Sequence, residues 1–214
     1  MPRPYRMGER TTRLEATRSR ILEAAIELYT EHGISATTMR EIGERADVAP
    51  GTLRHHFGSR EALERAMVDR LTAGAPLPEL TIFDGSRTIA ERLERLLRAG
   101  GMFIDQAQRI YRMWLREPML SGPWAEKGAE FGAHWNELMR AALGPLADDE
   151  EALALLRGML QPAFFEQVRG STRTTVQAAT LIASAIGPWY RQREAELNES
   201  RARDPASTTR PRGR

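Results

Sequence analysis

The sequence contains no cysteine, only four valines and no long apolar run. Without cysteine, a disulfide framework, a thiol nucleophile and a cysteine-ligated zinc site are all excluded. The most apolar stretch, residues 181–190, is shorter than the roughly 20 residues that a transmembrane helix needs. The basic N-terminus is not followed by an apolar segment of the signal-peptide type. We therefore expect a cytoplasmic protein that has no contact with membranes.

The residues that are abundant favour helices. Alanine, leucine and methionine number 29, 22 and nine, and all three are strong helix formers, whereas scarce valine argues against much sheet. A chain of 214 residues with 41% hydrophobic and 28% charged residues is typical of a globular protein with a real core. The fold class expected is all-α, in one large domain or one small and one larger domain.

The positive charge is concentrated at the two ends of the chain. Residues 1–20 carry six arginines against two glutamates, and residues 201–214 carry five arginines against one aspartate. The formal net charge is only +2, so the body between them is acidic. Basic ends suit a polyanionic partner, but they also suit solubilising tails, and charge alone does not separate the two interpretations.

Helical patterns begin near residue 17. Apolar residues at helical spacing predict a first helix that ends at Gly33. The segment Thr38 to Glu41 has the sequence of a capping box and begins a short second helix. Pro50 is suited to the first position of a short third helix, and Ser59 to the N-cap of a fourth.

The second and third helices have the size and spacing of a helix-turn-helix. The major groove of DNA admits one helix, and a short helix brings its first residues to base edges. Thr52, Arg54 and His55 are polar and close together, which is unusual for a helix that only fills a core. Thr38 has a hydroxyl and a backbone N–H that suit a phosphate.

Three consecutive segments carry a family resemblance. ILEAAIELYTEHG, TTMREIGERADV and GTLRHHFGSREAL closely resemble the N-terminal domain of TetR-family transcriptional regulators. The resemblance covers about a quarter of the chain and implies a set of residues at or near DNA. These residues are Thr38, Arg40, Pro50, Gly51, Thr52, Arg54, His55 and Arg60.

The chain departs from the family pattern at several of these positions. Asp47 stands where glycine is common, and aspartate tolerates a left-handed turn better than most residues. Ala49 stands where a serine often caps the third helix. Arg54 replaces a tyrosine and Arg60 a lysine, both of which tend to contact phosphate in the family. Which of Thr52, Arg54 and His55 reads bases therefore stays open.

Several neighbouring residues have simpler interpretations. Leu53 and Phe57 are expected in the core, and Arg40 and Arg60 have solvated surface charges as their alternative role. His134 is expected to be structural. No metal site or cofactor is expected, because no set of ligands stands at metal-binding spacing.

Binding by a helix-turn-helix calls for two copies related by a two-fold axis, and hence for a palindromic operator. The last two helical patterns supply apolar and small residues for such a homodimer, in the four-helix arrangement that the resemblance also implies. The interface residues expected are Leu156, Met159, Leu160, Val176, Ala179, Ala183 and Ile186. The alternative is that these faces pack only within one chain.

The middle of the chain is rich in large adaptable side chains, where TetR-like proteins usually hold an inducer. A pocket of this kind suits a small hydrophobic effector, although such stripes are more often ordinary core. The residues expected to line it are Met102, Phe103, Trp114, Trp124, Phe131, Trp135 and Phe164.

The resulting hypothesis is a homodimeric DNA-binding regulator, a repressor that a small organic ligand releases from its operator. The alternative is a helical DNA-binding or interaction protein without an inducer. The sequence contains no P-loop, no G-x-S-x-G, no H-E-x-x-H and no paired Glu-x-x-His motif, so we do not expect an enzyme. The expected organisation is a flexible basic arm (1–16), a helix-turn-helix DNA-binding domain (17–62), a larger helical ligand-binding and dimerisation domain (63–199) and a flexible basic tail (200–214).

Overall fold

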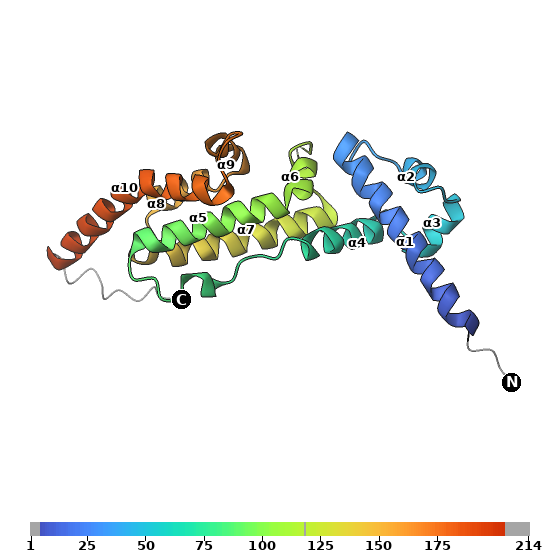
Figure 1. Ribbon diagram of the computed structural model, residues 1–214, viewed down its shortest axis with the longest axis horizontal. Coiled ribbons are helices and arrows are strands. Elements are labelled where there is room, and N and C mark those ends of the chain that lie inside the picture. Colours follow the sequence, from blue (N-terminus) through green and yellow to red (C-terminus); the bar gives the residue numbers. More distant parts are fainter. Residues whose placement is uncertain (1–4, 118, 204–214) are drawn as a thin grey trace, which may run out of the picture. The chain divides into compact units, whose positions relative to one another are not determined.

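The computed structural model describes residues 5–117 and 119–203, with side chains from residue 11 onward, and every regular element within these ranges is helical. Figure 1 shows their order along the chain. The elements are α1 (Tyr5–His32), α2 (Met39–Arg45), α3 (Pro50–Phe57), α4 (Arg60–Ala73), η1 (Leu80–Phe83), α5 (Ile89–Gln106), α6 (Gln108–Trp114), α7 (Gly122–Leu143), η2 (Gly144–Leu146), α8 (Glu150–Met159), α9 (Pro162–Arg169) and α10 (Thr175–Arg203). The expected all-α fold class is confirmed.

The helices form two compact units whose boundaries differ from those expected. The first unit contains the chain up to residue 76 together with residues 107–130, and the second contains residues 77–106 together with residue 131 onward. The chain therefore passes from one unit to the other three times.

The ends of the chain are more helical than expected. Helix α1 begins at Tyr5, so the expected flexible arm is helical from residue 5 to residue 16, and residues 1–4 lie outside the described part. Arginine, glutamate, alanine and leucine in this segment are good helix formers, and no proline occurs between residues 5 and 16. At the other end α10 continues to Arg203, and the rest of the expected tail lies outside the described residues.

The core of the first unit joins helices that are distant in sequence. Ile21 and Tyr29 of α1 pack with Leu53 of α3 in one buried cluster. Met113 and Trp124, which follow Tyr29 by more than 80 residues, belong to the same cluster. The rings of Tyr29 and Trp124 are 6.4 Å apart. The later segment thus completes the core of the N-terminal helices.

The second unit depends on two adjacent glycines in α5. A Cβ atom at Gly100 would lie 2.6 Å from the Leu160 side chain, and one at Gly101 would lie 2.5 Å from the Phe165 ring. Real Cβ atoms do not approach other atoms so closely, so these glycines allow α5 to pack directly against its neighbours. Pro162 begins α9 after a break that follows α8, because a proline fits the first turn of a helix and not its interior.

Candidate nucleic-acid interface

The start of α2 and the turn between α2 and α3 are built as the sequence predicts. The capping box is confirmed, with the Glu41 backbone N–H donating to Thr38 Oγ1 at 3.3 Å and the Thr38 N–H donating to the Glu41 carboxylate at 2.8 Å. Asp47 has a φ of 52°, the left-handed conformation expected for this position. The Val48 N–H then donates to the Gly43 carbonyl at 3.0 Å, which closes the turn.

Helix α3 buries one face and exposes the other. Leu53 and Phe57 are buried, as predicted. Thr52 is half-buried, whereas Arg54 and His55 are exposed. Side chains that anchor this helix are therefore separate from the polar side chains that it presents.

The beginning of α3 is open. Ala49 makes no side-chain capping bond, and Pro50 has no N–H to satisfy. A Cβ atom at Gly51 would meet nothing within 4 Å. This exposed backbone leaves space for a close approach by a partner.

Thr38 and Arg40 at the start of α2, which are expected to lie at or near DNA, both have partners within the chain. The Thr38 hydroxyl donates to the Glu41 carboxylate at 2.7 Å, so both of its donors already have an acceptor. These hydrogen bonds hold the pKa of Glu41 below its usual range. Arg40 is exposed and makes one ion pair, with Glu44 at 3.2 Å, which is too weak to hold it against a competing anion.

Arg60, which is expected at or near DNA, makes three hydrogen bonds within its own chain. Its Nη1 donates to the Thr37 carbonyl at 2.8 Å and its Nη2 to the Ile34 carbonyl at 2.5 Å. Its Nε donates to Glu64 Oε1 at 2.8 Å. With these partners, the guanidinium is held against the loop that precedes α2, and 38% of the side chain stays exposed.

Glu64 is a buried carboxylate at the centre of this arrangement. The Tyr29 hydroxyl also donates to its Oε1, at 2.9 Å. Burial, followed by the charge of Glu64, raises the pKa of Tyr29, so this hydroxyl stays protonated and donates. The three side chains, Tyr29, Arg60 and Glu64, fasten α1 and α4 to the loop before α2. We call them the Tyr29–Arg60–Glu64 triad.

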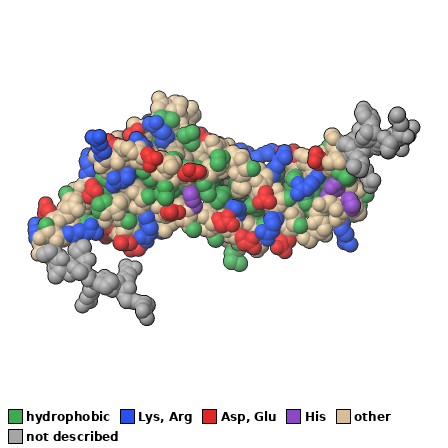
Figure 2. Space-filling view, turned by 90° about the horizontal axis from the view of Figure 1, so that it is seen from below, with side chains coloured by type: hydrophobic (Ala, Val, Ile, Leu, Met, Phe, Trp, Pro, Cys, Tyr) green, Lys and Arg blue, Asp and Glu red, His purple; other side chains and the backbone are tan. Residues whose placement is uncertain are grey.

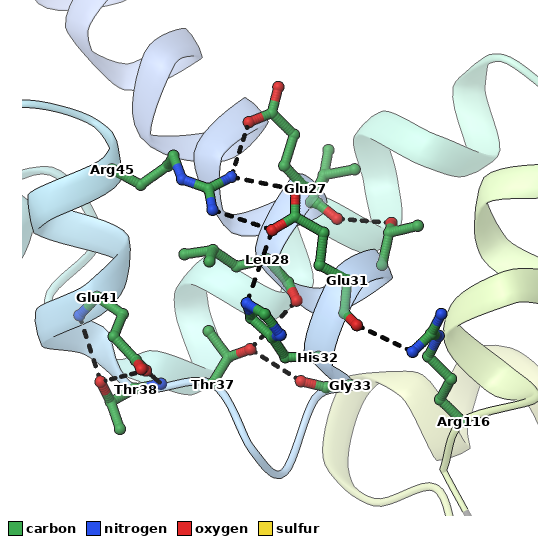
Figure 3. A network of polar contacts seen from close by, with 12 residues as sticks. Glu27, Leu28, Glu31, His32, Gly33, Thr37, Thr38, Glu41, Arg45 and Arg116 are labelled. Atoms are coloured by element: carbon green, nitrogen blue, oxygen red, sulfur yellow. Dashed lines mark hydrogen bonds and ion pairs between the residues drawn. The ribbon is translucent and has the colours of Figure 1, made fainter.

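A second polar network supports the other end of α2 (Figure 3). Arg45 donates to Glu31 at 2.9 Å and approaches Glu27 at 3.4 Å, which ties the last turn of α2 to α1. The Thr37 hydroxyl donates to the Gly33 carbonyl at 2.8 Å. The orientation of α2 is thus fixed at both of its ends.

Residues after α6 also hold the helix-turn-helix, and sequence reasoning missed them. The backbone N–H and hydroxyl of Ser35 donate to Glu117 at 2.9 and 2.8 Å. Arg116 donates to the Glu31 carbonyl at 2.9 Å, as Figure 3 also shows. No local pattern near residue 117 signals a contact with residue 35, because the two are 82 positions apart.

The basic groups near the end of α3 affect one another. Arg18 of α1 lies over the Phe57 ring, with 4.9 Å from its Cζ to the centroid. Burial, together with His55 and Arg18, lowers the pKa of His56. Figure 2 shows purple histidine side chains beside blue basic ones on the first unit. Basic side chains gather in this part of the surface, and Glu61 and Asp69 of α4 line the same surface pocket as Arg18.

The residues expected to line a ligand pocket fall into separate groups. Trp114 and Trp124 belong to the first unit and pack with its core. In the second unit, the Phe103 ring lies 5.5 Å from the rings of both Phe131 and Trp135. The other two, Met102 and Phe164, are exposed.

The residues expected at a dimer interface divide by burial. Leu156, Ala179 and Ile186 are buried within their own chain, so they are core residues. The side chains of Met159, Leu160 and Ala183 are half-buried, and that of Val176 is exposed. On α10, the exposed large apolar side chains also include Leu181 and Trp189, which the sequence did not single out.

Two further findings concern membrane-spanning helices and metal ligands in the described part of the chain. None of its helices combines the length and apolar character needed to cross a membrane. Within the same ranges, histidine, aspartate and glutamate side chains do not gather into a group able to hold a metal ion.

Known proteins are similar to this chain over different lengths. UidR of Escherichia coli (strain K12), an HTH-type transcriptional regulator, is 42% identical over 62 residues, which are 29% of this chain. This match spans only 32% of the length of UidR. A second HTH-type transcriptional regulator, in the dhlA 5' region of Xanthobacter autotrophicus, is 30% identical over 156 residues, or 69% of this chain and 75% of the relative.

The fold is also found in solved structures. MexZ, a repressor of Pseudomonas aeruginosa, superposes with a TM-score of 0.59 at 19% identity, over 80% of this chain and 94% of MexZ. The profile of the family described as bacterial regulatory proteins, tetR family, matches residues 21–67. From the coverage of the Xanthobacter relative and this profile match, the chain belongs to the TetR family of transcriptional regulators.

Proposed function

We propose that the protein is a homodimeric, sequence-specific DNA-binding regulator, and that it represses transcription until a small organic ligand releases it from a palindromic operator. Because a regulator of this kind acts on the chromosome, the proposal includes a cytoplasmic location. The observation that supports this proposed function is the exposed polar face of α3. Leu53 and Phe57 anchor that helix, while Arg54 and His55 are exposed beside an open N-terminus.

A selection of genomic fragments by the purified protein tests this function. We expect the fragments enriched at moderate salt to share a palindromic sequence, because two identical reading heads require two related half-sites. Enrichment without a common sequence would instead indicate a non-specific DNA coater, whose affinity depends steeply on salt.

The outer face of α10 supports the homodimer. No charged residue occurs between Arg173 and Arg191. Along this uncharged segment Val176, Leu181 and Trp189 are exposed. A two-fold axis beside α10 would cover these apolar side chains with their copies in the partner, and small residues between them permit a close approach.

Replacing Leu181 by aspartate is expected to weaken the dimer about 100-fold or more, because the change places an unpaired charge in each half of an apolar interface. Sedimentation equilibrium measures the effect. Leu80→Asp is the matched control, since Leu80 is 44% exposed and Leu181 43% exposed in the same unit. Equal dimer affinities for the two variants would show that the outer face of α10 is not the interface.

The protein has two groups of aromatic side chains that are available to bind the proposed effector. In the second unit, Phe103, Phe131 and Trp135 form edge-to-face contacts that suit a flat apolar molecule. In the first unit, the buried Trp124 Nε1–H has no acceptor within the described residues. Loss of operator binding on addition of a candidate ligand tests release, which requires that the ligand bind the DNA-free state more tightly.

A further inference from the structure

The first turns of α1 extend beyond the core that the rest of the helix helps to build. Burial in this helix begins at Ile21, and residues 11–16 are all exposed. Arg18 contacts the Phe57 ring at the end of α3. The residues before Arg18 therefore continue past the third helix as a projecting helical segment, which Figure 1 shows in dark blue.

Arginines in this segment differ from most arginines of the first unit. Elsewhere in that unit, the guanidinium groups commonly bind a carboxylate or a backbone carbonyl; examples are Arg45, Arg60, Arg65, Arg109 and Arg116. Arg13 and Arg20 are exposed and make no side-chain hydrogen bond or ion pair with any residue that the structure describes. Their charges are therefore available to an anion.

These two arginines lie on one side of the helix. They are seven residues apart, which is close to two turns, or about 10 Å along the axis. Thr17 lies between them on the same side and is uncharged, while Glu15 lies on the opposite side. In the sequence, Arg6 and Arg10 precede Arg13 at helical spacing. Glu9 also lies on this side, one turn before Arg13, but no acid stands between Arg13 and Arg20 on it. Two adjacent positive charges at this spacing fit the phosphates of a nucleic-acid backbone.

We propose that residues 5–20 of α1 form a rigid basic arm that binds the phosphate backbone of duplex DNA beside the groove that α3 enters. This inference rests on the proposed DNA-binding function and adds a second contact surface to it. A helix of 16 residues is about 24 Å long, which corresponds to about seven base-pair steps. The arm thus extends the bound site beyond the bases that α3 reaches.

The double variant Arg13→Gln/Arg20→Gln tests the arm. Glutamine keeps the helix propensity and removes two charges. We expect affinity to fall at least about tenfold at about 0.15 M salt, on the operator and on a scrambled duplex alike, because phosphate contacts are independent of sequence. The slope of log affinity against log salt should decrease by about two for each protomer. Fluorescence anisotropy across a salt series measures both.

The matched control is Arg70→Gln/Arg87→Gln. Both arginines are exposed, their side chains make no hydrogen bond or ion pair with the described residues, and their loss lowers the net charge equally. An unchanged salt slope in the arm variant, or equal losses in both double variants, would overturn the proposal. Failure of the proposed function is a different result, namely a wild-type protein that binds operator and scrambled duplex equally. The arm is still tested in that case, on the scrambled duplex.

Trimming the operator provides an independent measurement. Removal of about seven flanking base pairs from each side should weaken binding by the wild type and have little effect on the Arg13→Gln/Arg20→Gln variant, which has already lost these contacts. Equal effects of trimming on the two proteins would contradict an arm that lies along the flanks.

Discussion

Replacing Arg54 by glutamine is expected to lower operator affinity by at least about 30-fold without unfolding the protein. Arg54 is exposed on α3, and its side chain makes no hydrogen bond or ion pair with the residues that the structure describes. An arginine that contacts guanine or phosphate contributes a substantial charge-assisted interaction, and a dimer loses it at both half-sites. Anisotropy with the selected operator measures the affinity, and thermal melting checks the fold.

Arg70→Gln is the control for this variant. Arg70 is also an exposed arginine of the first unit, but it lies in the last turn of α4, far along the helix from α3. We expect it to change affinity less than twofold. If Arg54→Gln binds the operator as tightly as Arg70→Gln, the face of α3 does not read DNA. The pattern of loss also assigns the role of Arg54, since a base contact relaxes specificity at one position and a phosphate contact does not.

Replacing Glu64 by alanine is expected to produce the largest loss of stability among single substitutions in the Tyr29–Arg60–Glu64 triad. The change leaves the buried Tyr29 hydroxyl and the half-buried Arg60 guanidinium without their shared acceptor. We expect the loss of this central carboxylate to lower the free energy of unfolding by about 2–4 kcal/mol. The loss is no larger because part of the Arg60 guanidinium regains contact with water. Urea denaturation followed by circular dichroism measures this difference.

Glu61→Ala separates this effect from a general loss of charge. Glu61 is one turn before Glu64 on α4 and makes only an exposed ion pair with Arg65, so its removal should leave stability nearly unchanged. Tyr29→Phe should cost less than Glu64→Ala, and the double variant should cost less than the sum of the two, because they share one hydrogen bond. Full additivity would show that Tyr29 and Glu64 act independently.

The elements of the helix-turn-helix could be predicted because their signals are local. The capping box at Thr38, the proline at position 50 and the left-handed turn at Asp47 each involve residues within a few positions. Local hydrogen bonds and backbone preferences decide such features. The buried face of α3 followed from the same pattern, since only Leu53 and Phe57 are large and apolar there.

The role of Arg60 could not be predicted in this way. Its acceptors belong to Ile34, Thr37 and Glu64, and two of these are more than 20 positions away. An arginine at the start of a helix looks the same in the sequence whether it faces solvent or a folded loop. Only the tertiary structure decides between a phosphate contact and an internal one.

The apolar stripes of α8 and α10 had a related ambiguity. Helical periodicity identifies a face that avoids water, but it does not identify what covers that face. Leu156 and Ala179 are covered by their own chain, whereas Leu181 and Trp189 are exposed. The onset of α1 at Tyr5 was missed for another reason, because a charged segment without an apolar stripe has no period to detect.

The contribution of residues 107–130 to the first unit has a consequence for the protein during its synthesis. A nascent chain that ends at residue 76 contains α1 to α4, but Tyr29 still lacks Met113 and Trp124, which pack in the same core. Domains generally fold as units while they emerge from the ribosome. We therefore expect the core of the first unit to be completed only after residues 107–130 have been synthesised.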